Sequence, residues 1–222
     1  GDVSIPNGHP TGWYDLEVLD QNTGNWIMLN NAFEVNYSSP STSQIWYVST
    51  SGSDNNSGNI NSPFFTIQHA INTSSSGDTI LVSNGTYFET NISFGGKEVV
   101  LISENGAGET NIDGQNSGRI FDINQGESFN TEINGFAIIN GQESTGSAIR
   151  VINNSYLTIR NCVIANNSAP GIWTRAALTI GQAYNNGPAS PSGVHVFNTE
   201  FSENSGYYGA SVFNEESGNT QS

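Results

Sequence analysis

Residues 131–141 read TEINGFAIING, and a similar pattern returns as LTIRNCVIANN at 157–167 and as VHVFNTEFSEN at 194–204. Ile133 and Ile159 hold the same place in the first two copies, 26 residues apart. Repeats of roughly 20–50 residues are typical of solenoids, propellers and arrays. Each copy consists of short alternating stretches separated by Asn and Gly, without a helical period. This pattern predicts coils of short strands stacked into a parallel β-helix.

Alternation along each predicted strand assigns its side chains to two faces. The inward positions are predicted to be Val99, Leu101, Ile133, Phe136, Ile138, Leu157, Ile159, Cys162, Ile164, Val194, Val196 and Phe201. Asn140 and Asn166 fall at matching turn positions, where Asn tolerates a left-handed backbone and stacked amides can hydrogen-bond between coils. Residues 181–191 lie outside this register, and a long loop on a regular solenoid is often functional.

Residues 45–87 carry a more specific signal. A strand and an Asp/Gly/Ser-rich loop at 45–58 lead to SPFFTIQHAIN at 62–72 and GDTILVSNGTY at 77–87. This order resembles the opening of the pectin-lyase-like right-handed β-helix superfamily, over about residues 45–114, and the repeats continue to about 216. The resemblance implies a right-handed parallel β-helix that starts with a short cap helix. The stripe expected to cover the open end of the stack consists of Phe65, Ile67, Ala70 and Ile71.

The first residues predict a separate element. WYDLEVLD at 13–20 and the apolar stretch at 26–35 flank the turn QNTGN, which is typical of a β-hairpin. The hairpin resembles the last strands of an immunoglobulin-like module. The predicted organisation is this β-sandwich remnant at 1–36, a Ser/Pro/Thr-rich linker at 37–44 and the β-helix at 45–222. We expect the chain to be part of a longer precursor with adjacent domains.

The 222-residue chain has 5 Lys and Arg against 20 Asp and Glu, a net charge of −15. Binding to nucleic acid needs basic patches, so this balance argues against nucleic acid as a partner. No apolar run is long enough to span a bilayer, so no membrane insertion is expected. The simplest interpretation of the charge is a solvated acidic surface, and cation binding is the alternative. The single cysteine, Cys162, is predicted to be a small buried hydrophobic residue.

A second strand type repeats at residues 147–151, 170–174 and 210–214. When these copies are aligned on their inward residues, one outer face carries a column of Arg150, Trp173 and Phe213. A ring beside a guanidinium can hold a sugar by stacking and bidentate hydrogen bonding, or it can simply cover the protein's own surface. The candidate carbohydrate-binding residues are Arg150, Trp173, Phe213, Arg160, Arg175 and Tyr184.

Catalytic residues are not evident. Polysaccharide lyases of β-helix fold use Lys or Arg as the base and neutralise a uronate with Arg or calcium, and no cluster matches them residue by residue. Glycosidases of this fold use paired carboxylates, and the available ones, outside any recognisable motif, are Asp113, Asp122, Glu200 and Glu203. Three histidines lack metal-ligand spacing, so no metal or cofactor is expected, although calcium could bind near Asp54 or Asp78.

Together these patterns favour a secreted or cell-surface β-helix repeat protein, extracellular in location. It is expected to contact a polysaccharide or cell-surface glycan, anionic or hydroxyl-rich, without catalysis. Two alternatives stay open: a polysaccharide lyase or glycoside hydrolase of β-helix fold, and a structural spacer in a large adhesin.

Overall fold

The computed structural model describes residues 12–19, 26–35, 43–171, 174, 177–181, 191–207 and 211–215, with the backbone alone at 12–19, 26–35 and 213–215. The chain divides into two compact units, Gly1–Thr42 and Ser43–Ser222. In the first unit β1 (Gly12–Leu19) and β2 (Trp26–Val35) pair antiparallel, with a register shift between Tyr14 and Leu16. The predicted hairpin is therefore confirmed, whereas its origin in an immunoglobulin-like module stays a prediction.

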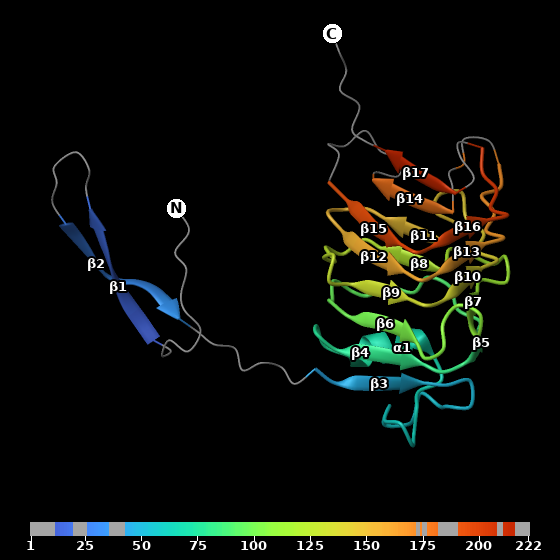
Figure 1. The fold of residues 1–222 in the computed structure, drawn as a ribbon, viewed down its shortest axis with the longest axis horizontal. Helices are drawn as coiled ribbons and strands as arrows, with labels where there is room; N and C mark the ends of the chain where they lie inside the picture. The colour runs from blue at the N-terminus through green and yellow to red at the C-terminus, as the bar shows by residue number, and fades with distance from the viewer. Residues whose placement is uncertain are drawn as a thin grey trace, which may run out of the picture. The chain divides into compact units, whose positions relative to one another are not determined.

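The second unit is a stack of coils whose strands form three parallel sheets (Figure 1). The first sheet consists of β3 (Ile45–Val48), β4 (Thr79–Val82), β6 (Val100–Ser103), β9 (Glu132–Asn134), β12 (Tyr156–Arg160) and β15 (Gly193–Phe197). The second consists of β5 (Gly85–Tyr87), β7 (Thr110–Asp113), β10 (Ala137–Ile139), β13 (Val163–Ala165) and β16 (Glu200–Ser202). The third consists of β8 (Phe121–Ile123), β11 (Ile149–Val151), β14 (Leu178–Gly181) and β17 (Val212–Glu215). From β6 onward each coil contributes one strand to each sheet, which confirms the predicted parallel β-helix.

The core is a column of aliphatic side chains inside the coils. Ile133 pairs with Ile159, and Ile159 pairs with Val196, as the repeats predict. The inward positions from Val99 to Ile164 are all buried. The expectation fails at Val196, which is 41% exposed, because β15 pairs only with β12 in the described part of the stack. Val194 and Phe201 of the same coil are only partly buried.

The predicted cap helix is α1 (Ile67–Thr73). Its first turn is capped by Thr66, whose hydroxyl accepts the His69 N–H, and by Glu89, whose carboxylate accepts two more backbone N–H groups. Ile67, Ala70 and Ile71 are buried as expected. Phe65 is not part of this stripe: it is 50% exposed, and the adjacent Phe64 is buried against Trp46 instead.

Asparagines connect the coils at the turns. The backbone of Asn161 is left-handed, with φ of 52°, and its amide bridges Asn134 below and Asn198 above. Asn140 and Asn166 are left-handed too, and the Asn140 amide donates to Asp113. Coil-to-coil bonding by turn asparagines is therefore confirmed, although the Asn134–Asn161–Asn198 ladder was not the one expected. Residues 182–190 of the predicted functional loop lie outside the described residues.

Candidate functional site

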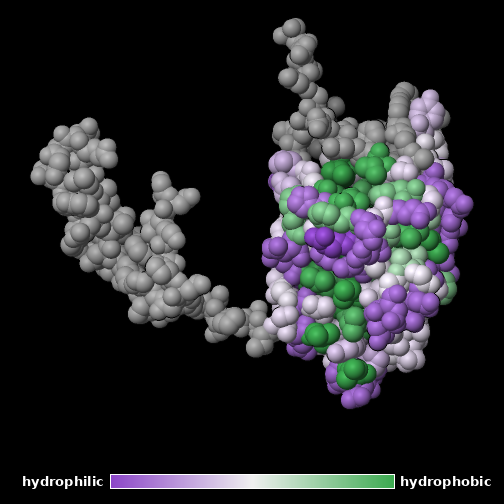
Figure 2. Space-filling model, viewed as in Figure 1, coloured by the Kyte–Doolittle hydropathy of each residue, from purple (hydrophilic) through white to green (hydrophobic). Residues whose placement is uncertain are grey.

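The outer face of the first sheet carries two aligned columns of side chains. Strand pairing places in one column Ile45, Thr79, Val100, Glu132, Thr158 and His195. The second column contains Tyr47, Leu81, Ile102, Asn134, Arg160 and Phe197. Figure 2 shows hydrophobic residues over β4 and β6 and a hydrophilic band over β9 and β12. The face therefore changes from apolar to charged and aromatic along the stack.

Aromatic side chains gather at the upper coils of this face. The Phe129 ring stacks flat on His195, with ring centres 3.8 Å apart and an interplanar angle of 4°, and it also contacts Tyr156 at 4.8 Å. The backbone carbonyl of Phe129 accepts the Thr158 hydroxyl at 2.8 Å. Because this segment covers it, Thr158 is buried although it points outward. Phe129 itself stays 37% exposed.

Arg160 lies at the centre of the same region. Its Nε donates to Glu132 Oε2 at 3.1 Å, and its guanidinium carbon lies 4.1 Å from the centre of the Phe197 ring. A cation over an aromatic face is attracted by the ring quadrupole. Phe197 is nevertheless 45% exposed, so the ring retains accessible surface. We refer to Phe129, Tyr156, Arg160, His195 and Phe197 as the aromatic–arginine cluster.

A shallow groove of about 490 Å³ runs beside the cluster. It is lined by Gly77, Glu98, Val100, Phe129, Asn130, Glu132, Thr158 and Arg160. The Glu98 carboxylate accepts hydrogen bonds from the Ser128 hydroxyl at 2.6 Å and from the Asn130 amide at 3.2 Å. These bonds hold the pKa of Glu98 below its ordinary value. The groove therefore presents an aromatic edge, one guanidinium and two carboxylates to an incoming molecule.

Residues 50–206 match the model of a family described as protein of unknown function (DUF1565). The chain belongs to this family. The match includes the whole groove and the aromatic–arginine cluster. No curated protein and no solved structure matches the chain significantly.

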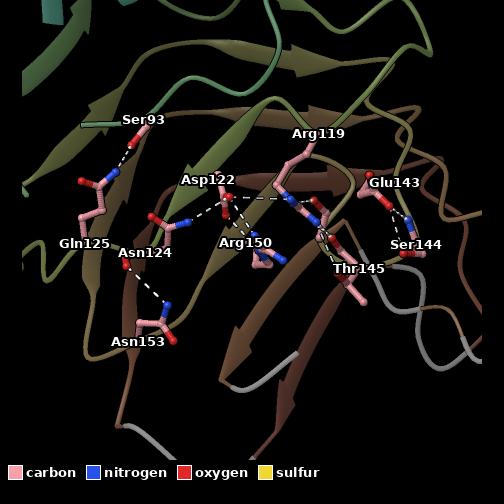
Figure 3. Close-up of polar contacts among 11 residues, drawn as sticks. Ser93, Arg119, Asp122, Asn124, Gln125, Glu143, Ser144, Thr145, Arg150 and Asn153 are labelled. Carbon is pink, nitrogen blue, oxygen red and sulfur yellow. Dashed lines mark hydrogen bonds and ion pairs between the residues drawn. The ribbon is translucent and has the colours of Figure 1, made fainter. Parts of the chain in front are cut away.

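A second group of arginines within the DUF1565 region lies around the third sheet (Figure 3). Arg150 forms a bidentate ion pair with Asp122, with Nε–Oδ1 and Nη2–Oδ2 distances of 2.8 and 2.7 Å. Arg119 is buried and donates to the backbone carbonyls of Thr145 and Gly146. Both guanidinium groups are held within the protein, so a sugar would have to compete with Asp122 for Arg150.

The predicted Arg150–Trp173–Phe213 column is wrong in register. Arg150 pairs with Thr179 of β14, and Thr179 pairs with Phe213 of β17, so the middle place belongs to Thr179. The side chain of Phe213 is not described, and three other candidates lie outside the described residues: Trp173, Arg175 and Tyr184. Of the six candidates, the structure therefore describes the side-chain surroundings of Arg150 and Arg160.

Three of the four carboxylates considered for glycoside hydrolysis, Asp113, Asp122 and Glu200, do not gather at one place. Asp113 lies in β7 and Glu200 in β16, three strand positions apart in the second sheet. At ~4.8 Å for each position this is about 14 Å, beyond the ~5–9.5 Å that glycosidase pairs need. Asp122 belongs to the third sheet and is paired with Arg150.

Asp54 and Asp78, considered for calcium, are occupied by internal hydrogen bonds. Asp54 accepts from the Phe65 and Thr66 backbone and from the Thr66 hydroxyl, and Asp78 accepts at both of its oxygens from the Gln44 and Ser75 backbone and the Trp46 indole. Within the described ranges no group of three or more His, Cys, Asp and Glu residues could hold a metal ion. In the same ranges no helix is long and apolar enough to cross a bilayer.

Cys162 is buried, and this burial raises the pKa of its thiol to about 11. The predicted hydrophobic role is therefore supported, since a nucleophilic cysteine needs a lowered pKa.

Sequence reasoning named Arg160 but missed its neighbours. The repeat alignment itself holds the signal for two of them, because Glu132 and His195 stand at equivalent outward positions of the copies around Thr158. Phe129 gives no such signal, since it lies between strands and reaches His195 only through the fold.

Proposed function

We propose that this chain is an extracellular or cell-surface β-helix protein that contacts polysaccharide through the groove of its first sheet, without catalysis. Two partly exposed rings carry the proposal: Phe129 lines the groove together with Arg160, and Phe197 contacts the guanidinium of Arg160. Aromatic rings bind sugars by stacking on their apolar faces, and guanidinium and carboxylate groups hydrogen-bond the hydroxyls. The pectin-lyase-like resemblance of residues 45–114 and the large net negative charge agree with such a setting.

The shape of the groove supports an extended ligand. It lies on strands whose inward neighbours, such as Leu101, Ile133 and Ile159, are fully buried, so the face has a rigid base. It is a surface hollow rather than an enclosed cavity. Small-molecule sites usually bury most of their ligand, whereas a chain molecule can use a shallow groove.

The basic residues argue for binding rather than lyase chemistry. Lys97 donates all its described hydrogen bonds to carbonyls at the end of α1, those of Ile71, Asn72 and Ser74. Arg160 is held by Glu132 and Phe197. A base that abstracts a proton must be free to reach it, and neither group has that freedom.

Glycoside hydrolysis is an alternative function, and one observation favours it. Glu98 and Glu132 line the same groove, and paired carboxylates are the usual catalytic groups of glycosidases. The lowered pKa of Glu98 disfavours its use as the protonated acid that hydrolysis needs, and the Glu132 carboxylate is held by its hydrogen bond from Arg160.

The test is affinity gel electrophoresis through a panel of polysaccharides with the wild type, Phe129→Ala and Phe197→Ala. Each ring contributes about 0.5–1.5 kcal/mol, so each change should weaken retention about 2- to 10-fold. Phe88→Ala is the matched control, since Phe88 is 61% exposed and belongs neither to the groove lining nor to the aromatic–arginine cluster. Trp173→Ala in the same gels tests the separate prediction made for that residue.

The outcomes separate the functions. Retention that depends on Phe129 and Phe197 but not on Phe88 supports the proposal. Absence of retention on every glycan overturns it and favours the structural spacer. New reducing or unsaturated ends in a retained glycan overturn the non-catalytic part and assign the groove to an enzyme.

A further inference from the structure

If the proposed function holds, the charges around the groove determine which class of glycan it can bind. Glu98 and Glu132 both line it, against the single guanidinium of Arg160. Arg160 is itself bonded to Glu132, so its charge is largely compensated before any ligand arrives. Glu98 stays ionised because the Ser128 and Asn130 hydrogen bonds lower its pKa. The local balance is therefore negative.

Among the described residues, no other basic side chain neutralises the negative charge of the groove. Lys97 is directed to the carbonyls at the end of α1. Arg119 and Arg150 are bonded within the third-sheet region, around Asp122 and Thr145 (Figure 3). The protein as a whole carries a net charge of −15, so its long-range field also repels anions.

We infer that the groove binds glycans that have no carboxylates and rejects polyuronates. Among the glycans that it binds, those that carry amines bind more tightly than neutral ones. This differs from the anionic glycan that the sequence left open. A uronate needs a cation that is free to pair with it, whereas Arg160 is paired with Glu132 and the Glu98 carboxylate repels the uronate. An amine of a glucosamine unit would instead meet the Glu98 carboxylate, which lines the groove beside Asn130.

The experiment measures binding of the full chain to soluble hexamers of glucose, glucosamine and galacturonate, at low and at high salt. One charge pair at ~4 Å in water corresponds to about 1 kcal/mol, or about fivefold in affinity. We expect the glucosamine hexamer to bind at least fivefold more tightly than the glucose hexamer, and the galacturonate hexamer at least fivefold more weakly. High salt should reduce both differences, because the groove is open to solvent.

Glu98→Gln should then raise the galacturonate affinity about fivefold relative to glucose and lower the glucosamine preference by a similar factor. Glu109→Gln is the matched control, because it removes the same charge from an exposed residue that does not line the groove. A galacturonate hexamer bound as tightly as glucose, or equal effects of the two variants, would overturn the inference and leave glycan binding itself standing. Failure of all three hexamers and of the parent polysaccharides to bind would instead overturn the proposed function and this inference with it.

Discussion

The guanidinium of Arg160 lies 4.1 Å from the ring centre of Phe197, its strand partner in the next coil. The same side chain donates to Glu132 in the coil below, so one arginine connects three successive coils on the outer face. A parallel β-helix buries its core inside the coils, so the fold does not depend on contacts between outer side chains. The contacts of Arg160 with Phe197 and Glu132 instead hold the cluster in a fixed geometry for a ligand.

A double-mutant cycle with Arg160→Met and Phe197→Leu measures this contact. The expected coupling free energy is about 0.5–1 kcal/mol, because the pair is partly exposed to solvent. Urea unfolding of the four proteins gives the value. The control cycle pairs Arg160→Met with Phe88→Leu, whose effects should add within about 0.3–0.5 kcal/mol. Equal coupling in the two cycles would show that Arg160 and Phe197 are neighbours without an energetic contact.

Two adjacent residues of β13 test the register of the coils. Ile164 is fully buried and Val163 points to the other side of the strand. Ile164→Ala should cost about 2–5 kcal/mol, because it leaves a cavity in the stack. Val163→Ala should cost less than about 1 kcal/mol. Similar losses in urea unfolding would contradict the assignment of Ile164 to the core and Val163 to the outer face.

The sequence predicts the first two sheets well in the last three coils, where the paired inward residues of the two strands are always five positions apart: Ile133 and Ile138, Ile159 and Ile164, Val196 and Phe201. The pair Ile133 and Ile159 could be read directly from the repeats, and it is a true strand pair. The outward partners Glu132, Thr158 and His195 follow from the same alignment. Their importance was missed because an alignment shows neighbours but does not show which of them are exposed.

The third sheet was misaligned because the segments that lead into it differ in length. β10 ends at Ile139 and β11 begins at Ile149, whereas β13 ends at Ala165 and β14 begins at Leu178. When the connection varies in length, more than one apolar residue can be aligned with the inward residue of a strand. The repeat alignment takes the copy at 170–174, whereas the true partner of Ile149 is Leu178. Phe64 and Phe65 show the same limit, since two adjacent rings have equal hydrophobicity and only packing decides which is buried.

Asp78 should make stability depend on pH at the N-terminal end of the stack. Burial raises its pKa, but hydrogen bonds from Ser75, Gln44 and Trp46 and the charge of Lys97 lower it below the ordinary value. A carboxylate with a lowered pKa stabilises the fold above its unfolded pKa of about 3.9, and this stabilisation is lost as pH falls through the folded value.

Asp78→Asn should therefore cost about 1.5–3 kcal/mol at neutral pH, the range for hydrogen bonds to a charged group. The difference from wild type should shrink as pH falls below about 4. Urea unfolding of both proteins over that range measures it, with the exposed Glu109→Gln as the control. A difference that does not change with pH would show that the Asp78 charge contributes nothing.

Asn161 combines two roles that substitutions can separate. Its φ of 52° is left-handed, and its amide bonds to Asn134 and Asn198 at 2.9 and 2.8 Å. Asn161→Gly removes the amide and keeps the backbone conformation accessible, so it should lose only the ladder bonds, at about 0.5–1.5 kcal/mol each. Asn161→Ala should lose a further ~1–2 kcal/mol, because alanine resists the left-handed region.

Alanine should therefore be worse than glycine at position 161, the reverse of the order in an ordinary strand, where glycine is worse by about 0.5–1 kcal/mol. Thr86 in β5 provides the comparison, because it lies in a strand and has no positive φ. Thermal unfolding of the Gly and Ala variants at both positions should show opposite orders. If the Gly and Ala variants have the same order of stability at both positions, Asn161 contributes only through its amide and not through its backbone conformation. If all variants are as stable as the wild type, the asparagine ladder does not contribute to coil stacking.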